Sequence, residues 1–283
     1  LIADGDVIDG YGNHALPNTT IAVLRNNKDA ISYQWGLVGD GVTDDTLAFK
    51  AALAYTISQG GTFYVKPPAV AYLITDSISV PKWARIEGDK ADSVSDGYGQ
   101  DPKTSRINFT PTTAKPLFIS DGASHTGFRF NQSIKGLFCK STNANGSIGL
   151  DANGCIYGSF EYITFEDFDV GVLCTATINN TFSNIYISAT TACVKYAGLN
   201  ETTDVWDKCA FFSAPIGIEV IGSSLGVRFD NCLFEQLGTL ADLSKEAQNI
   251  SFTDSYAEDI CYDNLATSAA FKVGISGTTL VAT

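Results

Sequence analysis

A repeat of 22 to 26 residues, beginning at Ser133, constrains the fold of this chain more than any other feature of its sequence. Six segments align, and their first residues are 133, 159, 181, 205, 228 and 251. A nearly constant period with β-type residues in register predicts a solenoid of stacked coils. Leucine-rich repeats have similar periods, but their LxxLxLxxN signature is absent, which favours a β-helix.

The aligned segments also predict which side chains face inward. The second position is apolar in all six, namely Ile134, Phe160, Phe182, Trp206, Phe229 and Phe252. Positions five and seven are mostly apolar and should share the inner face, so positions six and eight should face outward. We therefore expect the five aromatic rings from Phe160 to Phe252 to form one buried stack. The fourth position, with Asn184, Lys208, Asn231 and Asp254, predicts a ladder of corners.

The stretch from Gly39 to Gly61 predicts a turn, a capped helix and a helix stop. It begins GDGVTDDT, continues as an Ala-rich run to Ser58 and ends in Gly60-Gly61. Thr43 or Asp44 can cap the helix, and Gly60 can end it in a left-handed conformation. The β-rich runs 62–65 and 72–74 that follow predict the first strands.

This stretch resembles the start of the pectate-lyase-like superfamily, to which bacteriophage tailspikes and capsule depolymerases belong. The resemblance covers about residues 36–88 and implies a right-handed parallel β-helix whose N-terminal end is covered by the helix. It implies that Asp40, Asp44 and Asp45 are turn and cap residues rather than catalysts. The chain departs from its relatives at Trp35-Gly-Leu-Val38, where they often carry an Asp-Phe-Gly-Ala-like sequence.

We expect an N-terminal arm over residues 1–35, containing a short helix, and a β-helix over residues 36–283. Apolar patches of the arm could pack against another copy of the chain. The sequence lacks Met and ends without an obvious cap. An uncapped solenoid exposes a strand edge, so we expect either that the native chain continues or that another subunit covers this end.

Composition excludes several classes of partner. The net charge is −13, whereas nucleic acid and anionic membranes attract basic surfaces. The two His residues and seven Cys residues show no zinc-binding spacing, so we expect no metal and no cofactor. We interpret the cysteines as free thiols in the core. The sequence shows no signal peptide and no membrane-spanning run. Together with the free thiols, this predicts that the chain folds in a host cytoplasm.

Outward acids on neighbouring coils are the candidate catalysts. Glu235 and Glu258 share the eighth position one coil apart, with Asp259 beside them and Phe212 one coil earlier. One rung is ~4.8 Å, close to the ~5 Å between the two carboxyl groups of a retaining glycosidase. Phe212 would be an exposed ring on which a sugar could stack.

Other acids stay as alternatives. Asp207 and Asp230 share the third position on adjacent coils, and Glu166 lies beside Asp167 and Asp169. A solvated acidic face is the simpler interpretation of each set. Tyr98, in the long loop-rich stretch 89–127, could contact a sugar.

The resemblance and the acids together predict a phage tailspike depolymerase that cleaves a bacterial capsule or O-antigen, most simply by hydrolysis. A lyase would need a cation near the acids, and Arg228 and Lys208 are the basic groups there. A non-catalytic carbohydrate-binding β-helix is the other alternative. The resemblance implies a homotrimer on a virion tail that contacts other tail proteins through its N-terminal region. The active site could then lie within one subunit or between two.

Overall fold

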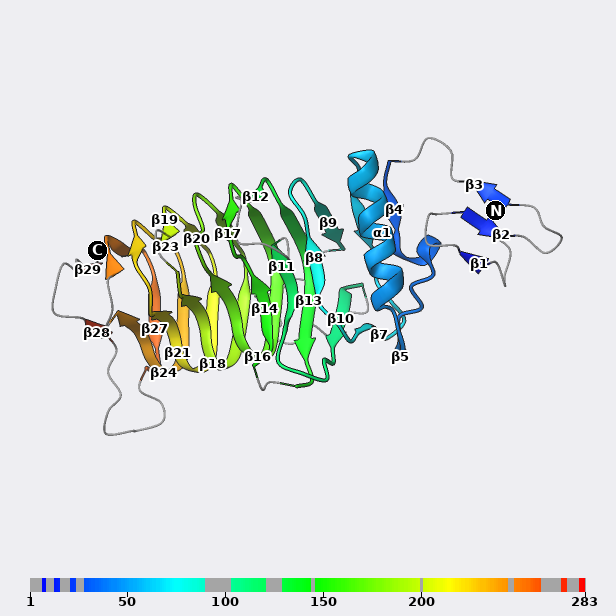
Figure 1. Ribbon diagram of the computed structural model, residues 1–283. Coiled ribbons are helices and arrows are strands. Elements are labelled where there is room, and N and C mark those ends of the chain that lie inside the picture. Colours follow the sequence, from blue (N-terminus) through cyan, green and yellow to red (C-terminus); the bar gives the residue numbers. More distant parts are fainter. Residues whose placement is uncertain are drawn as a thin grey trace.

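The structure, a computed structural model, describes residues 28–89, 103–120, 129–143, 146–198, 201–243 and 247–260, with short strand segments near both ends. Its strands stack in successive coils, and the strands paired between coils run parallel (Figure 1). The predicted all-β parallel β-helix is confirmed. The division at residues 35 and 36 stays a prediction.

The first part of the chain contains one α-helix and eleven strands. Near the N-terminus, three short strands pair antiparallel: β1 (Val7–Ile8), β2 (Asn13–Ala15) and β3 (Ile21–Val23). The first coils contain β4 (Ala30–Ile31), β5 (Asp40–Asp44), α1 (Thr46–Gln59), β6 (Phe63–Val65), β7 (Ala71–Ile74), β8 (Ile78–Val80), β9 (Arg85–Gly88), β10 (Ser105–Phe109) and β11 (Pro116–Ser120).

The repeat supplies the remaining strands. Its first half holds β12 (Arg129–Phe130), β13 (Ser133–Ser141), β14 (Ile148–Asp151), β15 (Cys155–Ile156), β16 (Ser159–Cys174), β17 (Thr181–Ser183) and β18 (Tyr186–Tyr196). Its second half holds β19 (Glu201–Thr202), β20 (Val205–Asp207), β21 (Ala210–Val220), β22 (Ser224–Leu225), β23 (Arg228–Asp230), β24 (Leu233–Leu243), β25 (Ala247–Gln248), β26 (Ile250–Thr253) and β27 (Tyr256–Glu258). Two strands lie further along the chain, β28 (Phe271–Val273) and β29 (Leu280–Ala282).

Left-handed residues turn the coils at recurring corners, two in every segment of the repeat and a third in four of the six segments, at Asp167, Ser213, Gln236 and Asp259. The second corner is the predicted ladder, and φ is 48° to 68° at Gly136, Tyr162, Asn184, Lys208, Asn231 and Asp254. The first corner lies two residues before each segment, and the third lies at its ninth position, as at Ser213 and Gln236. Asn and Gly tolerate this conformation at low cost, which explains the Asn residues of the ladder.

The predicted aromatic stack forms the centre of the core. Successive ring centroids from Phe160 through Phe182, Trp206 and Phe229 to Phe252 lie 5.0, 4.0, 6.0 and 5.2 Å apart. All five side chains are buried, and neighbouring rings are stacked. Each such contact adds about 0.5–1.5 kcal/mol beyond area burial. The prediction from the second position is therefore confirmed.

The six described cysteines are buried thiols of the core, as the sequence indicated. Burial raises the pKa of Cys155 to about 12, so the thiol stays protonated. Cys261 lies outside the described residues.

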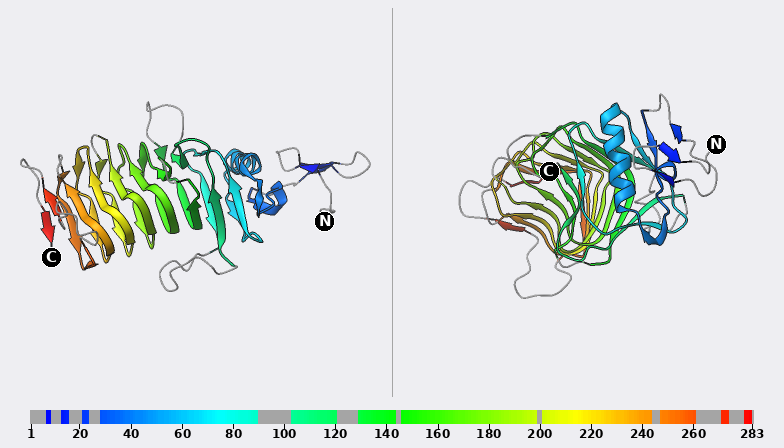
Figure 2. Two further views of the ribbon diagram at one scale, coloured as in Figure 1. Left: turned by 90° about the horizontal axis from the view of Figure 1, so that it is seen from below. Right: turned by 45° about the vertical axis from the view of Figure 1, so that its right-hand side comes forward.

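Helix α1 covers the N-terminal end of the stack (Figures 1 and 2). Phe49 is buried and lies edge-on to Phe63, with ring centroids 4.8 Å apart. Gly60, at φ 67°, ends the helix as predicted. The arm's expected short helix is a 3-10 turn, η1 (Ser32–Trp35).

The acids before α1 are structural, as predicted, but their roles differ in detail. Asp44 accepts a hydrogen bond from the Thr46 N–H at 3.0 Å and so caps the helix. The Asp45 carboxylate is buried and accepts the N–H groups of Val38 and Gly39 at 2.6 and 3.2 Å. Desolvation raises the pKa of Asp45. Asp45 therefore holds the turn rather than capping the helix.

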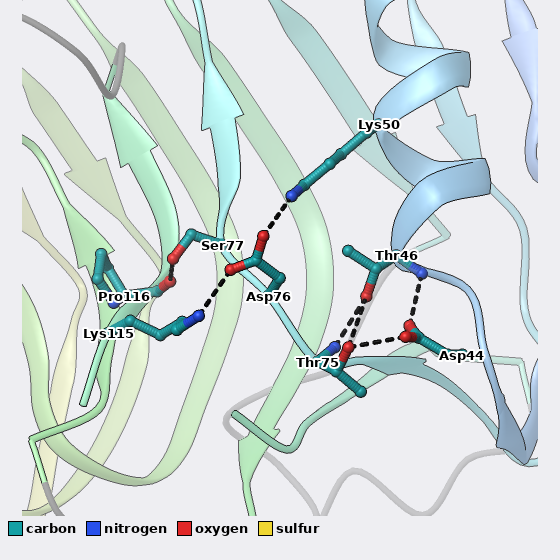
Figure 3. A network of polar contacts seen from close by, with 8 residues as sticks. All are labelled: Asp44, Thr46, Lys50, Thr75, Asp76, Ser77, Lys115 and Pro116. Carbon is teal, nitrogen blue, oxygen red and sulfur yellow. Dashed lines mark hydrogen bonds and ion pairs between the residues drawn. The ribbon is translucent and has the colours of Figure 1, made fainter. Parts of the chain in front are cut away.

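A polar network ties α1 to the first coils (Figure 3). The Asp76 carboxylate contacts the ammonium groups of Lys50 at 2.7 Å and Lys115 at 2.8 Å. Thr46 Oγ1 accepts the Thr75 N–H at 2.8 Å. The network thus joins the helix, the turn between β7 and β8, and the turn before β11.

One residue of the predicted inner face is exposed, although its strand has the predicted register. Ala257 was expected to point into the core but is exposed. Its strand β27 pairs with β24 on one side, and among the described strands none pairs with its other side.

Candidate functional site

Glu235 and Glu258 lie side by side on one outward face of the solenoid, between the second and third corners. Strand β24 pairs with β27 so that Glu235 is opposite Glu258, and β21 pairs with β24 so that Phe212 is opposite Glu235. Neighbouring strands of a sheet are ~4.8 Å apart. The predicted column is therefore present, with one aromatic residue followed by two glutamates.

The surroundings of the two glutamates differ. Glu235 is half-buried, whereas Glu258 is exposed. The hydroxyl of Tyr256 donates a hydrogen bond to Glu258 Oε2 at 3.0 Å. This hydrogen bond and the nearby Glu258 charge raise the pKa of Tyr256, so the phenol remains a donor. Asp259 is exposed at the next corner, with φ 51°.

An aromatic pair lies before the glutamates on the same face. Phe212 is half-buried, and its ring stacks on that of Tyr186, with centroids 5.0 Å apart and planes 20° apart. Tyr186 and Tyr256 were not predicted as site residues. Both occupy the sixth position of the repeat, which alternates with the buried fifth and seventh positions. That alternation is the signal by which the sequence could have identified them.

Asp207 and Asp230 are also adjacent, but on a different face. They are opposite one another in β20 and β23, between the first and second corners. Asn231 Nδ2 donates to Asp207 Oδ1 at 3.1 Å, and Arg228 lies 3.6 Å from Asp230. The left-handed corner at Asn231 separates Asp230 from Glu235. These two acids therefore do not join the glutamate column.

Glu166 belongs to the glutamate column three rungs before Glu235, where it forms an ion pair with Lys140. Lys140 Nζ lies 2.6 Å from Glu166 and 3.0 Å from Asp167. The Glu166 hydrogen bond is the main cause of the raised pKa of Lys140. Asp169 instead accepts hydroxyl hydrogen bonds from Thr190 and Thr191. Tyr98 lies outside the described residues.

Within the described part of the chain, no group of three His, Cys, Asp or Glu side chains is arranged to hold a metal ion. Among the same residues no helix has both the length and the apolar character needed to span a bilayer.

The fold matches those of phage proteins that have been solved. One is the phiAB6 tailspike in complex with oligosaccharides of Acinetobacter baumannii surface polysaccharide, with 18% identity, a TM-score of 0.67 and coverage of 89% of this chain and 46% of that chain. Another is the tailspike of E. coli bacteriophage HK620, with 13% identity, a TM-score of 0.61 and coverage of 96% and 54%. A third is the pre-mature bacteriophage phi29 gene product 12, with 15% identity, a TM-score of 0.62 and coverage of 89% and 36%.

The chain spans about half or less of the length of these three proteins. At such low identity the likeness establishes a shared fold. No protein-family model and no curated protein matches the sequence.

Proposed function

We propose that this chain is the polysaccharide-cleaving part of a bacteriophage tailspike and hydrolyses a bacterial capsule or O-antigen. The observation that carries the proposal is the column of Phe212, Glu235 and Glu258 on adjacent rungs of one outward face. The substrate class is supported by the phiAB6 tailspike, whose structure holds oligosaccharides of a bacterial surface polysaccharide. A virion tail is the corresponding location.

The spacing of the two glutamates suits a retaining glycosidase. Such enzymes use two carboxyl groups about 5 Å apart, and adjacent rungs are ~4.8 Å apart. Glu258 accepts a hydrogen bond from Tyr256, which suits an ionised carboxylate, so we assign Glu258 as the nucleophile. Glu235, nearer the aromatic pair, is assigned as the acid.

The reaction then proceeds in two displacements. Glu258 attacks the anomeric carbon, the glycosidic C–O bond breaks, and Glu235 donates its proton to the leaving oxygen. Glu235 next removes a proton from water, and the hydroxyl group displaces Glu258 from the anomeric carbon. The stacked rings of Phe212 and Tyr186 would hold a neighbouring sugar by contact with its apolar face.

Glu235→Gln and Glu258→Gln test the assignment, because each keeps the shape and removes the acid. Each should lower turnover by at least ~100-fold, the low end for general acid or base catalysis, with glycan affinity largely kept. Asp254→Asn is the matched control, since Asn already occupies the same corner at Asn184 and Asn231. It should cleave at the parent rate.

Product mass distinguishes the alternatives. Hydrolysis adds one water molecule per cleaved bond, whereas a lyase leaves an unsaturated sugar without that gain. Parent-rate cleavage by both Gln variants would place the site elsewhere, for instance between subunits. Binding without any cleavage by the parent chain would favour a carbohydrate-binding role instead.

A further inference from the structure

Two bulky aromatic residues occupy corner positions where most other coils use small or amide side chains. The first corner holds residues with φ between 54° and 74°, namely Trp83, Asn131, Tyr157, Asn179, Thr203, Gly226 and Asn249. Strand register aligns them, because Arg85 is opposite Ser133 and Ser133 is opposite Ser159.

Neither aromatic residue is explained by the fold. Left-handed backbone strains bulky side chains, whereas Asn and Gly adopt it readily. Burial of the rings does not offset this strain, because Trp83 is 57% and Tyr157 is 56% exposed. Strained residues are concentrated at binding and catalytic sites. Exposed rings held by a rigid corner therefore point to a ligand.

The spacing and neighbours of the rings indicate the chemistry of that ligand. Trp83 and Tyr157 are two rungs apart, ~9.6 Å at the usual strand spacing, with the exposed Asn131 between them. Arg85 is exposed on the adjoining face and has no ion-pair partner within the described ranges. Lys135, by contrast, pairs with Glu161 at 2.9 Å. The corner and the adjoining face thus offer two stacking rings, an amide and a guanidinium group that has no ion-pair partner in the described part of the chain. The exposed Glu87 lies two residues further along the same strand.

We propose that Trp83, Asn131, Tyr157 and Arg85 form a second, non-cleaving binding site for an acidic polysaccharide chain. The rings would stack on alternate sugars, and Arg85 would bind a carboxylate or another acidic substituent. The site lies in the first coils and on a different face from Glu235 and Glu258. It rests on the proposed function for the class of ligand, but not for the cleavage chemistry.

The test replaces both rings by the residue that the corner itself uses. Trp83→Asn with Tyr157→Asn is made in a chain that also carries Glu235→Gln and Glu258→Gln, so that bound glycan stays intact. The probe is an array of immobilised bacterial capsular and O-antigen polysaccharides, both acidic and neutral. Affinity for the bound acidic polysaccharide should fall at least about tenfold, which corresponds to about 1.4 kcal/mol. The unfolding temperature should be kept or raised, because strain is relieved.

Two further variants complete the design. Arg85→Gln should weaken binding of acidic polysaccharides more than of neutral ones. Tyr33→Asn, which removes an exposed ring elsewhere, should leave binding unchanged. If Trp83 and Tyr157 have a purely structural role, their Asn variants should unfold at a lower temperature and bind glycan as tightly as the parent.

The outcomes also separate this site from the proposed enzyme activity. If the parent chain cleaves the glycan and the Trp83→Asn/Tyr157→Asn pair leaves glycan affinity unchanged, the second site is overturned and the enzyme activity is not. Binding that depends on the pair, with no cleavage by the parent, overturns the depolymerase alone. The second site is also overturned if the chain binds none of the acidic polysaccharides. It is overturned as well if the Trp83→Asn/Tyr157→Asn pair changes the oligomeric mass but not glycan affinity.

Discussion

Asp204 is a fully buried carboxylate inside the stack. It accepts hydrogen bonds from Thr177 Oγ1 at 2.6 Å, from the Asn180 N–H at 2.9 Å and from Asn180 Nδ2 at 3.0 Å. Within the described residues no cation pairs with it, and the titratable groups that interact with it are Cys155 and Tyr196. Desolvation raises its pKa to about 6. Ionisation of this carboxyl is therefore less favourable in the folded protein than in the unfolded chain.

This burial predicts a pH dependence of stability. The unfolded chain has the ordinary pKa near 3.8, so between about pH 4 and 6 the folded protein binds more protons than the unfolded chain. The free energy of unfolding should fall as pH rises through this window, by on the order of 3 kcal/mol from this group. Denaturant titrations at a series of pH values measure the slope.

Asp204→Asn is the matching variant. The new amide can face Thr177, whose hydroxyl can accept as well as donate, while its oxygen keeps both Asn180 donors. The variant should fold and should lose much of the decline between pH 4 and 6. An unchanged slope would show that another group causes the dependence.

At the scale of elements, Asp76 joins α1 to the first coils through Lys50 and Lys115 (Figure 3). The carboxylate is half exposed, and exposed ion pairs contribute about 0.2–1 kcal/mol each. Asp76→Asn should lower the free energy of unfolding by about 1 kcal/mol in urea titrations. Adding Lys50→Gln to this variant should cost little more, because the pair is already broken. If the losses in the free energy of unfolding from the two substitutions simply add, Asp76 and Lys50 do not stabilise the protein as a pair.

The Asp76 contribution should have the opposite pH dependence to that of Asp204. Hydrogen bonds from Lys115 and Lys50 hold the pKa of Asp76 well below its usual range. Its stabilising effect is therefore present above about pH 4 and lost as pH falls below that value.

Some of these features could be predicted from the sequence and others could not. The aromatic stack could be predicted because inward residues recur in every coil at one position of the repeat. The Asp204 network could not, because its column reads Gln132, Gly158, Asn180, Asp204 and Val227 and has no recurring type. The adjacency of Glu235 and Glu258 followed from the period. The alternation also indicates that Tyr256 faces outward. Its hydrogen bond to Glu258 could not be predicted, because the repeat does not specify which outward side chains contact one another.

At the scale of the whole molecule, the capped end carries exposed apolar side chains. Val42 on β5 and Leu47 in the first turn of α1 are each 80% exposed, and Val70, which adjoins Gly41, is 55% exposed. Large exposed apolar groups at one end of a molecule are typical of surfaces that contact another chain. These side chains are consistent with the expectation that the protein assembles with copies of itself.

We expect a homotrimer, as the superfamily resemblance implies, with these apolar residues close to an interface between subunits. Light scattering at micromolar concentration should give three times the mass of the chain. Val42→Asp with Leu47→Asp places charges on the contact and should lower that mass, because a buried unpaired charge is costly. Trp83→Asn serves as the control, since its corner lies on the glycan-binding face proposed above and should leave the mass unchanged. A parent chain that stays monomeric under these conditions would contradict the trimer and would confine the active site to a single subunit.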